Sequence, residues 1–333
     1  MSDKTILSHE WQQLRALRKR FLEGSAGKQD YWENFRLLEL YNQTFAERIA
    51  WKWQYVLSEL HRLRWQPPTS AVLDWGCGTG IASRTFLRAF ALPNAHLTLY
   101  DRSALAVKFA EQKHREAFPQ VSLLPFSDTA FQGVVLLSHI ITELSMQDLA
   151  VLLQRLRAAA AILWVESGEY HTSRKLIDVR EQLRSDFHIV APCTHQRRCG
   201  LLTEENAPHW CHHFAHVPQA AFTEKRWSEF RAHIGIDLSQ LPLSYLVLDK
   251  RVAPALPHLS SRLIGGTRLY KGYAAVLACS EQGVAEYRLS KRHFPQVYRQ
   301  MKNGEADTLV SIQAEHGNVV HLESIAVQEM RKV

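Results

Sequence analysis

The chain has 333 residues, with 40 Lys and Arg against 33 Asp and Glu and a formal net charge of +7. Hydrophobic residues make up 46% and charged residues 22% of the sequence, a composition that excludes a disordered chain, a collagen-like repeat and a small disulfide scaffold. Its apolar runs are too short to cross a bilayer, so we expect no membrane span. Five cysteines and an N-terminus without a secretory pattern favour a reducing, cytoplasmic compartment.

The chain divides into three predicted regions. Residues 1–68 are expected to be helical, because apolar residues recur there at three- and four-residue spacing. From residue 69 to 254, short apolar runs alternate with helical patterns, which predicts an α/β domain with a parallel sheet. The predicted strands are 71–73, 96–100, 121–124, 133–137, 161–166 and 244–249, and the predicted helices are 81–90, 104–117, 147–159 and 170–190.

Two further segments lack the alternation of strand and helix patterns that this domain shows. Residues 191–219 show no clear periodicity and carry three of the five cysteines. Residues 255–333 contain strand-like runs between glycine-containing turns, RLIGG, GYAAVLAC and VAEYRLS among them. We therefore expect a cysteine-rich insertion in the α/β domain and a small β-rich C-terminal domain.

The segment AVLDWGCGTG, residues 71–80, places Gly76, Gly78 and Gly80 directly after a strand. Glycines there permit a tight strand-to-helix turn and let a ligand lie close to backbone N–H groups. A second strand ends at Asp101, where an open α/β sheet offers a carboxylate to a ribose diol. The strand, the turn and the spaced acid together predict a site for a nucleoside-containing cofactor.

The composition of this turn separates two cofactor classes. It has the pattern G-x-G-x-G with Asp74 two residues before the first glycine, whereas the dinucleotide fingerprint is G-x-G-x-x-G. It resembles motif I of the class I S-adenosylmethionine-dependent methyltransferases. That resemblance implies that Asp74 lies near the methionine end of the cofactor, that Asp101 binds the ribose, and that Ser127 and Asp128 flank the adenine.

A methyl acceptor site is less evident. Base N-methyltransferases usually carry an Asn/Asp-Pro-Pro-aromatic stretch after the fourth strand, whereas this chain has LLSHIITELS at 136–145. His139 and Glu143 are candidates for acid–base chemistry, but we favour orienting or helix-capping roles for them. No catalytic residue is assigned.

Cys193, Cys199 and Cys211 lie within the irregular segment, with His195, His212 and His213 nearby. Thiolates bound to a metal can order such a loop. A nearby histidine as fourth ligand would favour zinc, and a distant cysteine would favour an iron–sulfur cluster. Cys279 is the candidate distant cysteine.

Several of these segments occur in a consistent order that is similar to the Rsm-twenty-two type of methyltransferase-like proteins. They are PCTHQRRC at 192–199, WCHHF at 210–214, SYLVL at 244–248 and RLIGGTRLYKGYAAVLAC at 262–279. The resemblance implies a class I methyltransferase (Rossmann-like) sheet and a four-cysteine iron–sulfur site, with a 4Fe-4S cluster on Cys193, Cys199, Cys211 and Cys279. It also implies contact with the small ribosomal subunit and its rRNA.

The C-terminal region interleaves cations with aromatic residues, which is what an RNA surface requires. The cations are Arg262, Arg268, Lys271, Arg288, Lys291, Arg292, Arg299 and Lys302, and the aromatic residues are Tyr270, Tyr273, Tyr287 and Tyr298. A solvated basic face with core tyrosines is the competing interpretation, and the resemblance favours RNA.

Together these features predict a cytoplasmic protein that binds S-adenosylmethionine and an iron–sulfur cluster and acts on, or helps to assemble, the small ribosomal subunit. The sequence does not fix its oligomeric state, and we favour a monomer. Two alternatives stay open: a non-catalytic assembly factor that retains the cofactor pocket, and a small-molecule methyltransferase with a structural zinc site.

Overall fold

The computed structural model describes residues 6–23, 30–92, 94–257 and 259–325. The chain forms two compact units, each assembled from several segments. We call them the first and the second unit. The first contains Met1–Ser58, Gln66–Glu166 and Ala215–Leu243, and the second contains Glu59–Trp65, Ser167–Phe214 and Ser244–Val333.

A parallel sheet forms the centre of the first unit. Its strands lie in the order β3 (Ser122–Leu124), β2 (His96–Tyr100), β1 (Ala71–Trp75), β4 (Val134–Ser138) and β5 (Ala161–Ser167). The direction of strand succession reverses between β1 and β4, and the crevice outside the carboxyl ends of such strands is where open α/β sheets bind ligands. This sheet confirms the predicted Rossmann-like α/β fold.

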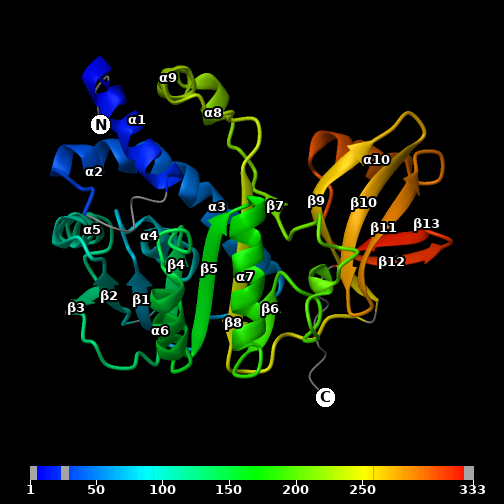
Figure 1. Cartoon of the computed structure of the whole chain (residues 1–333), viewed down its shortest axis with the longest axis horizontal. Coiled ribbons are helices and arrows are strands. Elements are labelled where there is room, and N and C mark those ends of the chain that lie inside the picture. Colours follow the sequence, from blue (N-terminus) through cyan, green and yellow to red (C-terminus); the bar gives the residue numbers. More distant parts are fainter. Residues whose placement is uncertain (1–5, 24–29, 93, 258, 326–333) are drawn as a thin grey trace. The chain divides into compact units, whose positions relative to one another are not determined.

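Helices surround this sheet in the first unit (Figure 1). The crossover helices are α4 (Ile81–Ala89), α5 (Ala104–Ala117) and α6 (Met146–Leu156), and the remaining helices are α1 (Ser8–Leu22), α2 (Phe35–Asn42), α3 (Phe45–Arg62), α8 (Ala220–Thr223) and α9 (Lys225–Ile234). Arg15 and Arg18 of α1 donate to the carbonyls of His233 and Ile234, so they satisfy acceptors that the C-terminal end of α9 leaves open. The predicted helical character of the N-terminal region is confirmed over the residues described.

The second unit contains α7 (Tyr170–Leu183), followed by β6 (His188–Ala191), the 3-10 turn η1 (Gly200–Leu202), β7 (His213–Phe214) and β8 (Pro242–Asp249). β6 and β7 both pair with β8, and β6 runs antiparallel to it. The prediction of one helix over 170–190 was wrong at its end, because α7 stops at Leu183 and the buried residues Ile189 and Val190 belong to a strand.

A closed barrel completes the second unit, drawn in yellow to red in Figure 1. Its strands are β9 (Ser260–Leu269), β10 (Tyr273–Ser280), β11 (Gly283–Ser290), β12 (Leu309–Glu315) and β13 (Asn318–Ser324), in the order β10-β11-β13-β12-β9. Helix α10 (Pro295–Asn303) contributes Met301 to the barrel core beside Leu289 and Val310. The predicted β-rich C-terminal region is thereby confirmed, and residues 326–333 of it lie outside the described part of the chain.

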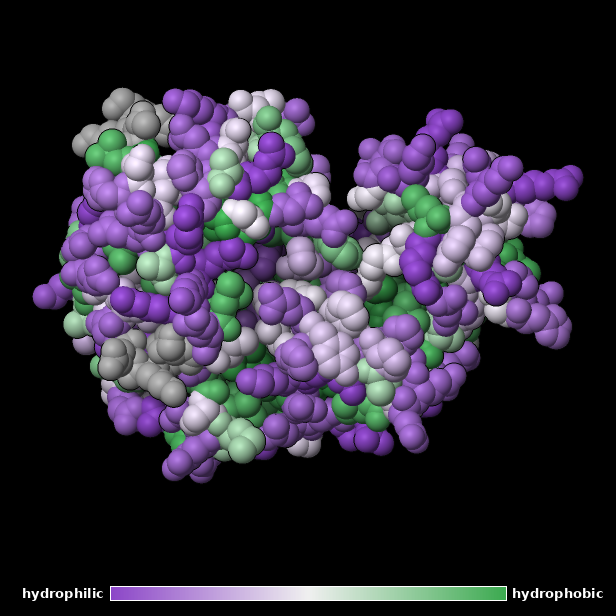
Figure 2. Space-filling view, turned by 45° about the horizontal axis from the view of Figure 1, so that its top comes forward, coloured by the Kyte–Doolittle hydropathy of each residue, from purple (hydrophilic) through white to green (hydrophobic). Residues whose placement is uncertain are grey.

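Hydrophilic side chains cover most of the face shown in Figure 2, and hydrophobic ones form small separate patches there. Among the residues that the structure describes, no helix combines the length and the apolar character that a membrane crossing requires.

Candidate functional site

The turn after β1 has the backbone geometry that its glycines predict. Gly76, Gly78 and Gly80 all adopt positive φ, at 72°, 51° and 71°. A Cβ on Gly76 would lie 2.7 Å from the Ile140 side chain, which follows β4, so only glycine permits this close approach. A Cβ on Gly78 would meet nothing within 4 Å. The turn is therefore packed on one side and open at Gly78, where a ligand can approach the backbone.

Two of the predicted carboxylates lie on either side of this turn. Asp101 accepts hydrogen bonds from the backbone N–H of Gly78 and of Ser103, both at 2.9 Å. Asp74 is fully buried, and its Oδ2 accepts from the Ser83 hydroxyl at 2.5 Å, whereas its Oδ1 has no hydrogen-bond partner among the residues that the structure describes. Burial raises the pKa of Asp74 to about 7 and also raises the pKa of Asp101.

Ser127 and Asp128 lie in the exposed loop after β3, where Asp128 forms an ion pair with Arg155. Aromatic rings lie at the same end of the sheet, and the sequence analysis did not single them out. The Tyr100 ring lies 4.3 Å from the rings of both Trp75 and Phe126, measured between centroids. Their signal in the sequence was an aromatic residue at or just beyond the carboxyl end of each of three adjacent strands.

A buried carboxylate, that of Glu166, binds the backbone of the segment after β4. Glu166 Oε1 accepts from the backbone N–H of Ile140 and of Ile141, both at 3.0 Å, and from the Trp164 indole at 2.7 Å. Burial raises the pKa of Glu166 to about 7. Because three donors converge on one oxygen, this segment has a fixed backbone beside the glycine turn.

His139 and Glu143 contact different neighbours in the structure. His139 has φ +57°, and its Nε2 lies 3.5 Å from Lys52 Nζ. Glu143 accepts from the Tyr31 hydroxyl at 3.4 Å and lies 3.5 Å from Arg102, and burial raises its pKa to about 7. Neither residue caps a helix, since Ser145 is the N-cap of α6.

The four cysteines predicted as ligands all belong to the second unit. Cys193 follows β6, Cys199 precedes η1, Cys211 precedes β7 and Cys279 lies on β10. Cys199 and Cys279 share one apolar cluster with Ile177, Leu201 and Ile264, and Cys211 packs against it. A Cβ on Gly200 would lie 3.0 Å from Gly283 Cα, so glycine lets η1 approach the β10–β11 turn.

The electrostatics of these thiols also show that they lie together. Burial and, to a smaller extent, the charge of Cys193 together raise the pKa of Cys199 to about 11. Burial likewise raises the pKa of Cys211 and of Cys279, and each is raised further by the other thiolates of the group. All four are free thiols. As the side chains are placed, the described residues contain no group of three or more His, Cys, Asp or Glu side chains arranged to hold a metal ion.

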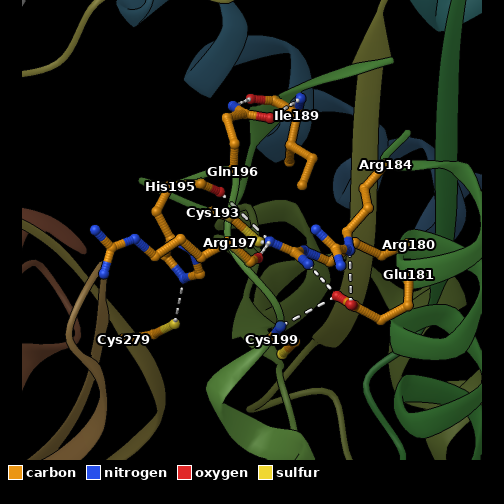
Figure 3. A network of polar contacts seen from close by, with 10 residues as sticks. All are labelled: Arg180, Glu181, Arg184, Ile189, Cys193, His195, Gln196, Arg197, Cys199 and Cys279. Carbon is orange, nitrogen blue, oxygen red and sulfur yellow. Dashed lines mark hydrogen bonds and ion pairs between the residues drawn. The ribbon is translucent and has the colours of Figure 1, made fainter. Parts of the chain in front are cut away.

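Polar groups contact each of the four thiols or their backbones; Cys211 Sγ, for one, lies 3.8 Å from His213 Nε2. Arg180 Nε donates to Cys193 Sγ at 3.2 Å, and Glu181 accepts from the backbone N–H of Cys199 at 3.1 Å. Cys279 Sγ lies 3.7 Å from His195 Nε2. Figure 3 shows these groups converging on the cysteine loop. The sequence analysis did not identify Arg180 or Glu181, which lie on α7 with no motif to mark them.

Residues 46–307 match the family described as "Mitochondrial small ribosomal subunit Rsm22". The chain belongs to this family. The match contains the glycine turn, both carboxylates and all four cysteines. A comparison with curated proteins found no match.

The chain is also similar to two solved methyltransferases. One is the plantazolicin methyltransferase BamL in complex with a triazolic desmethylPZN analogue and SAH, with 11% identity, 74% of this chain and 100% of that chain covered, and a TM-score of 0.39. The other is the precorrin-6y C5,15-methyltransferase from Geobacter metallireducens, with 13% identity, 60% and 89% covered, and a TM-score of 0.36. Likenesses this distant do not show what an Rsm22 family member binds.

The barrel of this Rsm22 family member carries most of the predicted cations on its surface. Arg262 is the exception: it is 2% exposed and its guanidinium lies 2.5 Å from Glu59, so its inclusion among the RNA-facing cations was wrong. Tyr270 and Tyr273 stack at 4.6 Å, and Arg288 lies 5.6 Å from the Tyr273 ring. The exposed predicted cations are Arg268, Lys271, Arg288, Lys291, Arg292, Arg299 and Lys302.

Proposed function

We propose that this protein carries a 4Fe-4S cluster on Cys193, Cys199, Cys211 and Cys279, binds S-adenosylmethionine at the turn after β1, and acts on or helps to assemble the small ribosomal subunit. The observation that carries the proposal is that Cys199 and Cys279 share one apolar cluster against which Cys211 packs, while Cys193 lies close enough to raise the pKa of all three. We further propose that it acts as a monomer in the cytoplasm.

The donor set suits the proposed cluster. Four thiolates are the usual ligands of a 4Fe-4S cluster, and each binds a different iron atom, so the sulfurs need not meet at one point. Burial raises the pKa values of Cys199, Cys211 and Cys279, which favours their neutral form. A bound metal centre would supply the positive charge that stabilises them as thiolates.

The turn after β1 suits S-adenosylmethionine for two reasons. The backbone is open at Gly78, next to the Asp101 carboxylate that would accept from the ribose hydroxyls. Asp74 Oδ1 is buried without a partner in the described part of the chain, which is costly unless a donor reaches it, and the methionine end of the cofactor carries an ammonium donor. Ser127 and Asp128 are proposed to flank the adenine.

Contact with rRNA is proposed from the family and from the barrel surface. The family's description names the small ribosomal subunit. Exposed Lys and Arg side chains with neighbouring tyrosines would bind phosphates and stack on unpaired bases. Such binding should weaken steeply as salt rises.

A second candidate function is that of an assembly factor that transfers no methyl group. It is favoured by the segment after β4, which has no Pro-Pro-aromatic stretch and whose backbone is fixed by Glu166. Incubation of immature and mature small subunits with radiolabelled S-adenosylmethionine separates the candidates. Label in rRNA supports an enzyme, and stable binding without label supports an assembly factor.

The cluster is tested by anaerobic purification and by assays of iron, acid-labile sulfide and zinc. We expect a brown protein with iron and sulfide, and C279S is expected to retain much less of both. C77S is the matched control, because Cys77 is buried in the glycine turn of the first unit. Stoichiometric zinc that C279S leaves unchanged would favour a zinc site within residues 193–213, and no metal at all would refute the cluster.

A further inference from the structure

Arg180 is a buried cation on α7, and its side chain is 3% exposed. Its Nε donates to Cys193 Sγ at 3.2 Å. Its Nη2 donates to the backbone carbonyls of His195, at 3.4 Å, and of Arg197, at 2.8 Å. One guanidinium therefore binds a thiol and the backbone of the loop that follows it, with its donors in the rigid fork that only arginine provides.

Glu181, the next residue of α7, binds the other end of the same loop. It accepts from the backbone N–H of Cys199 at 3.1 Å and forms an ion pair with Arg180. It is also paired with Arg184, whose Nε lies 2.9 Å from Glu181 Oε2. Two adjacent residues of α7 thus bind Cys193 and Cys199, the first two predicted ligands (Figure 3).

A third contact holds the middle of this loop. The Gln196 side chain accepts from the Ile189 N–H and donates to the Ile189 carbonyl, both at 2.8 Å. The loop from Cys193 to Cys199 is therefore fixed at both ends and in its middle by groups outside it. Loops that are ordered in this way lose less conformational entropy when they bind a ligand.

The charges around this loop are complementary to an anionic metal centre. Arg180 and Arg184 share one carboxylate, Glu181, which leaves an excess of positive charge beside Cys193. Four thiolates on a dicationic iron–sulfur core leave a net negative charge. A neutral thiol is a weak acceptor for a buried guanidinium donor, whereas a thiolate accepts a charge-assisted hydrogen bond.

We propose that Arg180 is a positioning residue of the iron–sulfur site: with Glu181 it holds the loop from Cys193 to Cys199 in its ligating form. Its N–H donation to the Cys193 sulfur retains the iron and raises the reduction potential of the cluster. This inference rests on the proposed cluster. It follows from the rule that hydrogen bonds to ligand sulfurs stabilise the reduced, more negative state and that outer partners of metal ligands tune affinity.

The test compares Arg180→Met and Arg180→Lys with Arg184→Met. Arg184 is the matched control because it lies on the same helix and pairs with the same Glu181, but its side chain is 40% exposed and donates to no cysteine in the described structure. The readouts are the rate of iron loss to a ferrous chelator and the midpoint potential of the cluster in an anaerobic titration. Circular dichroism and S-adenosylmethionine affinity report whether each variant is folded.

We expect Arg180→Met to lose iron about 10- to 100-fold faster than wild type, with a more negative midpoint potential. Arg180→Lys keeps the charge but loses the fork, so its rate of iron loss and its midpoint potential should lie between those of wild type and Arg180→Met. The rate of iron loss from Arg184→Met should stay within about twofold of wild type. Should Arg180→Met fail to fold, Arg180→Lys carries the same comparison.

Two results would overturn the inference in distinguishable ways. If wild type holds the cluster but both Arg180 variants retain iron and potential as Arg184→Met does, Arg180 has no role toward it and the cluster proposal stands. If anaerobic wild type contains no iron, the cluster proposal fails and the inference fails with it.

Discussion

Replacing Asp101 by asparagine tests the cofactor site directly. Each carboxylate oxygen of Asp101 accepts one backbone N–H, from Gly78 or from Ser103. Asparagine has one acceptor oxygen, so its amide NH2 would face the second backbone N–H, and the negative charge beside the ribose site would be lost. A hydrogen bond to a charged group contributes about 1.5–3 kcal/mol. We therefore expect the Kd for S-adenosylmethionine to rise about 10- to 150-fold.

The assay is isothermal titration calorimetry with S-adenosylmethionine and S-adenosylhomocysteine at pH 8. The high pH matters because burial raises the pKa of Asp101, and the carboxylate should be ionised in wild type. E116Q is the matched control: the Glu116 side chain is 54% exposed near the end of α5 and pairs with Lys113, so we expect its Kd to change by less than about threefold. Unaltered affinity of a folded D101N would refute the ribose role of Asp101 and leave it as a residue that orders the turn.

Three further predictions concern stability and RNA binding. Glu59→Gln should lower the free energy of unfolding by about 3–5 kcal/mol, because it leaves buried Arg262 without its carboxylate; a loss below about 1 kcal/mol in chemical denaturation would contradict this. The folded pKa of Glu166, about 7, exceeds its ordinary 4.5. The folded state therefore binds the extra proton between these values, and stability should fall as pH rises from 4.5 to 7 and then level off. Glu166→Gln should reduce that fall by about 3 kcal/mol, and parallel pH profiles for the two proteins would contradict it. Lys271→Ala and Arg292→Ala should each reduce the salt dependence of rRNA binding by about one phosphate contact, and an unchanged slope would exclude that side chain from the interface.

The strands and the glycine turn of the first unit could be predicted because their signals are local. The strand predicted at 96–100 is observed as His96–Tyr100, and the helix predicted at 104–117 is observed as Ala104–Ala117. An apolar run of strand length and an amphipathic helical pattern can each be recognised from residues that are close together in the sequence. The positive φ of all three glycines in the turn is a backbone requirement that the residue type itself indicates.

The parts that could not be predicted depend on partners distant in sequence. His188–Ala191 forms a strand because it pairs with β8, more than fifty residues later; the preceding helical pattern gave no reason to end the helix at Leu183. Arg262 was counted with the RNA-facing cations because composition does not report exposure, and its carboxylate partner Glu59 lies on α3. Arg180 and Glu181 carry no motif, since their role arises from contacts with a loop.

The position of Cys279 bears on how the second unit would respond to loss of its cluster. A ligand set that joins Cys193 to Cys279 closes a long stretch of chain, and such closure costs conformational entropy that metal binding must offset. The fold already supplies part of that closure: Cys279 is paired with Arg262 across β9 and β10, and Arg262 Nε donates to the Pro192 carbonyl at 3.0 Å. Neither contact uses the sulfur atom of a cysteine that would bind iron. Both contacts should therefore persist when iron is removed. We therefore expect cluster loss to increase amide exchange in the loop from Cys193 to Cys211 and next to Cys279, while the barrel strands distant from Cys279 keep their protection.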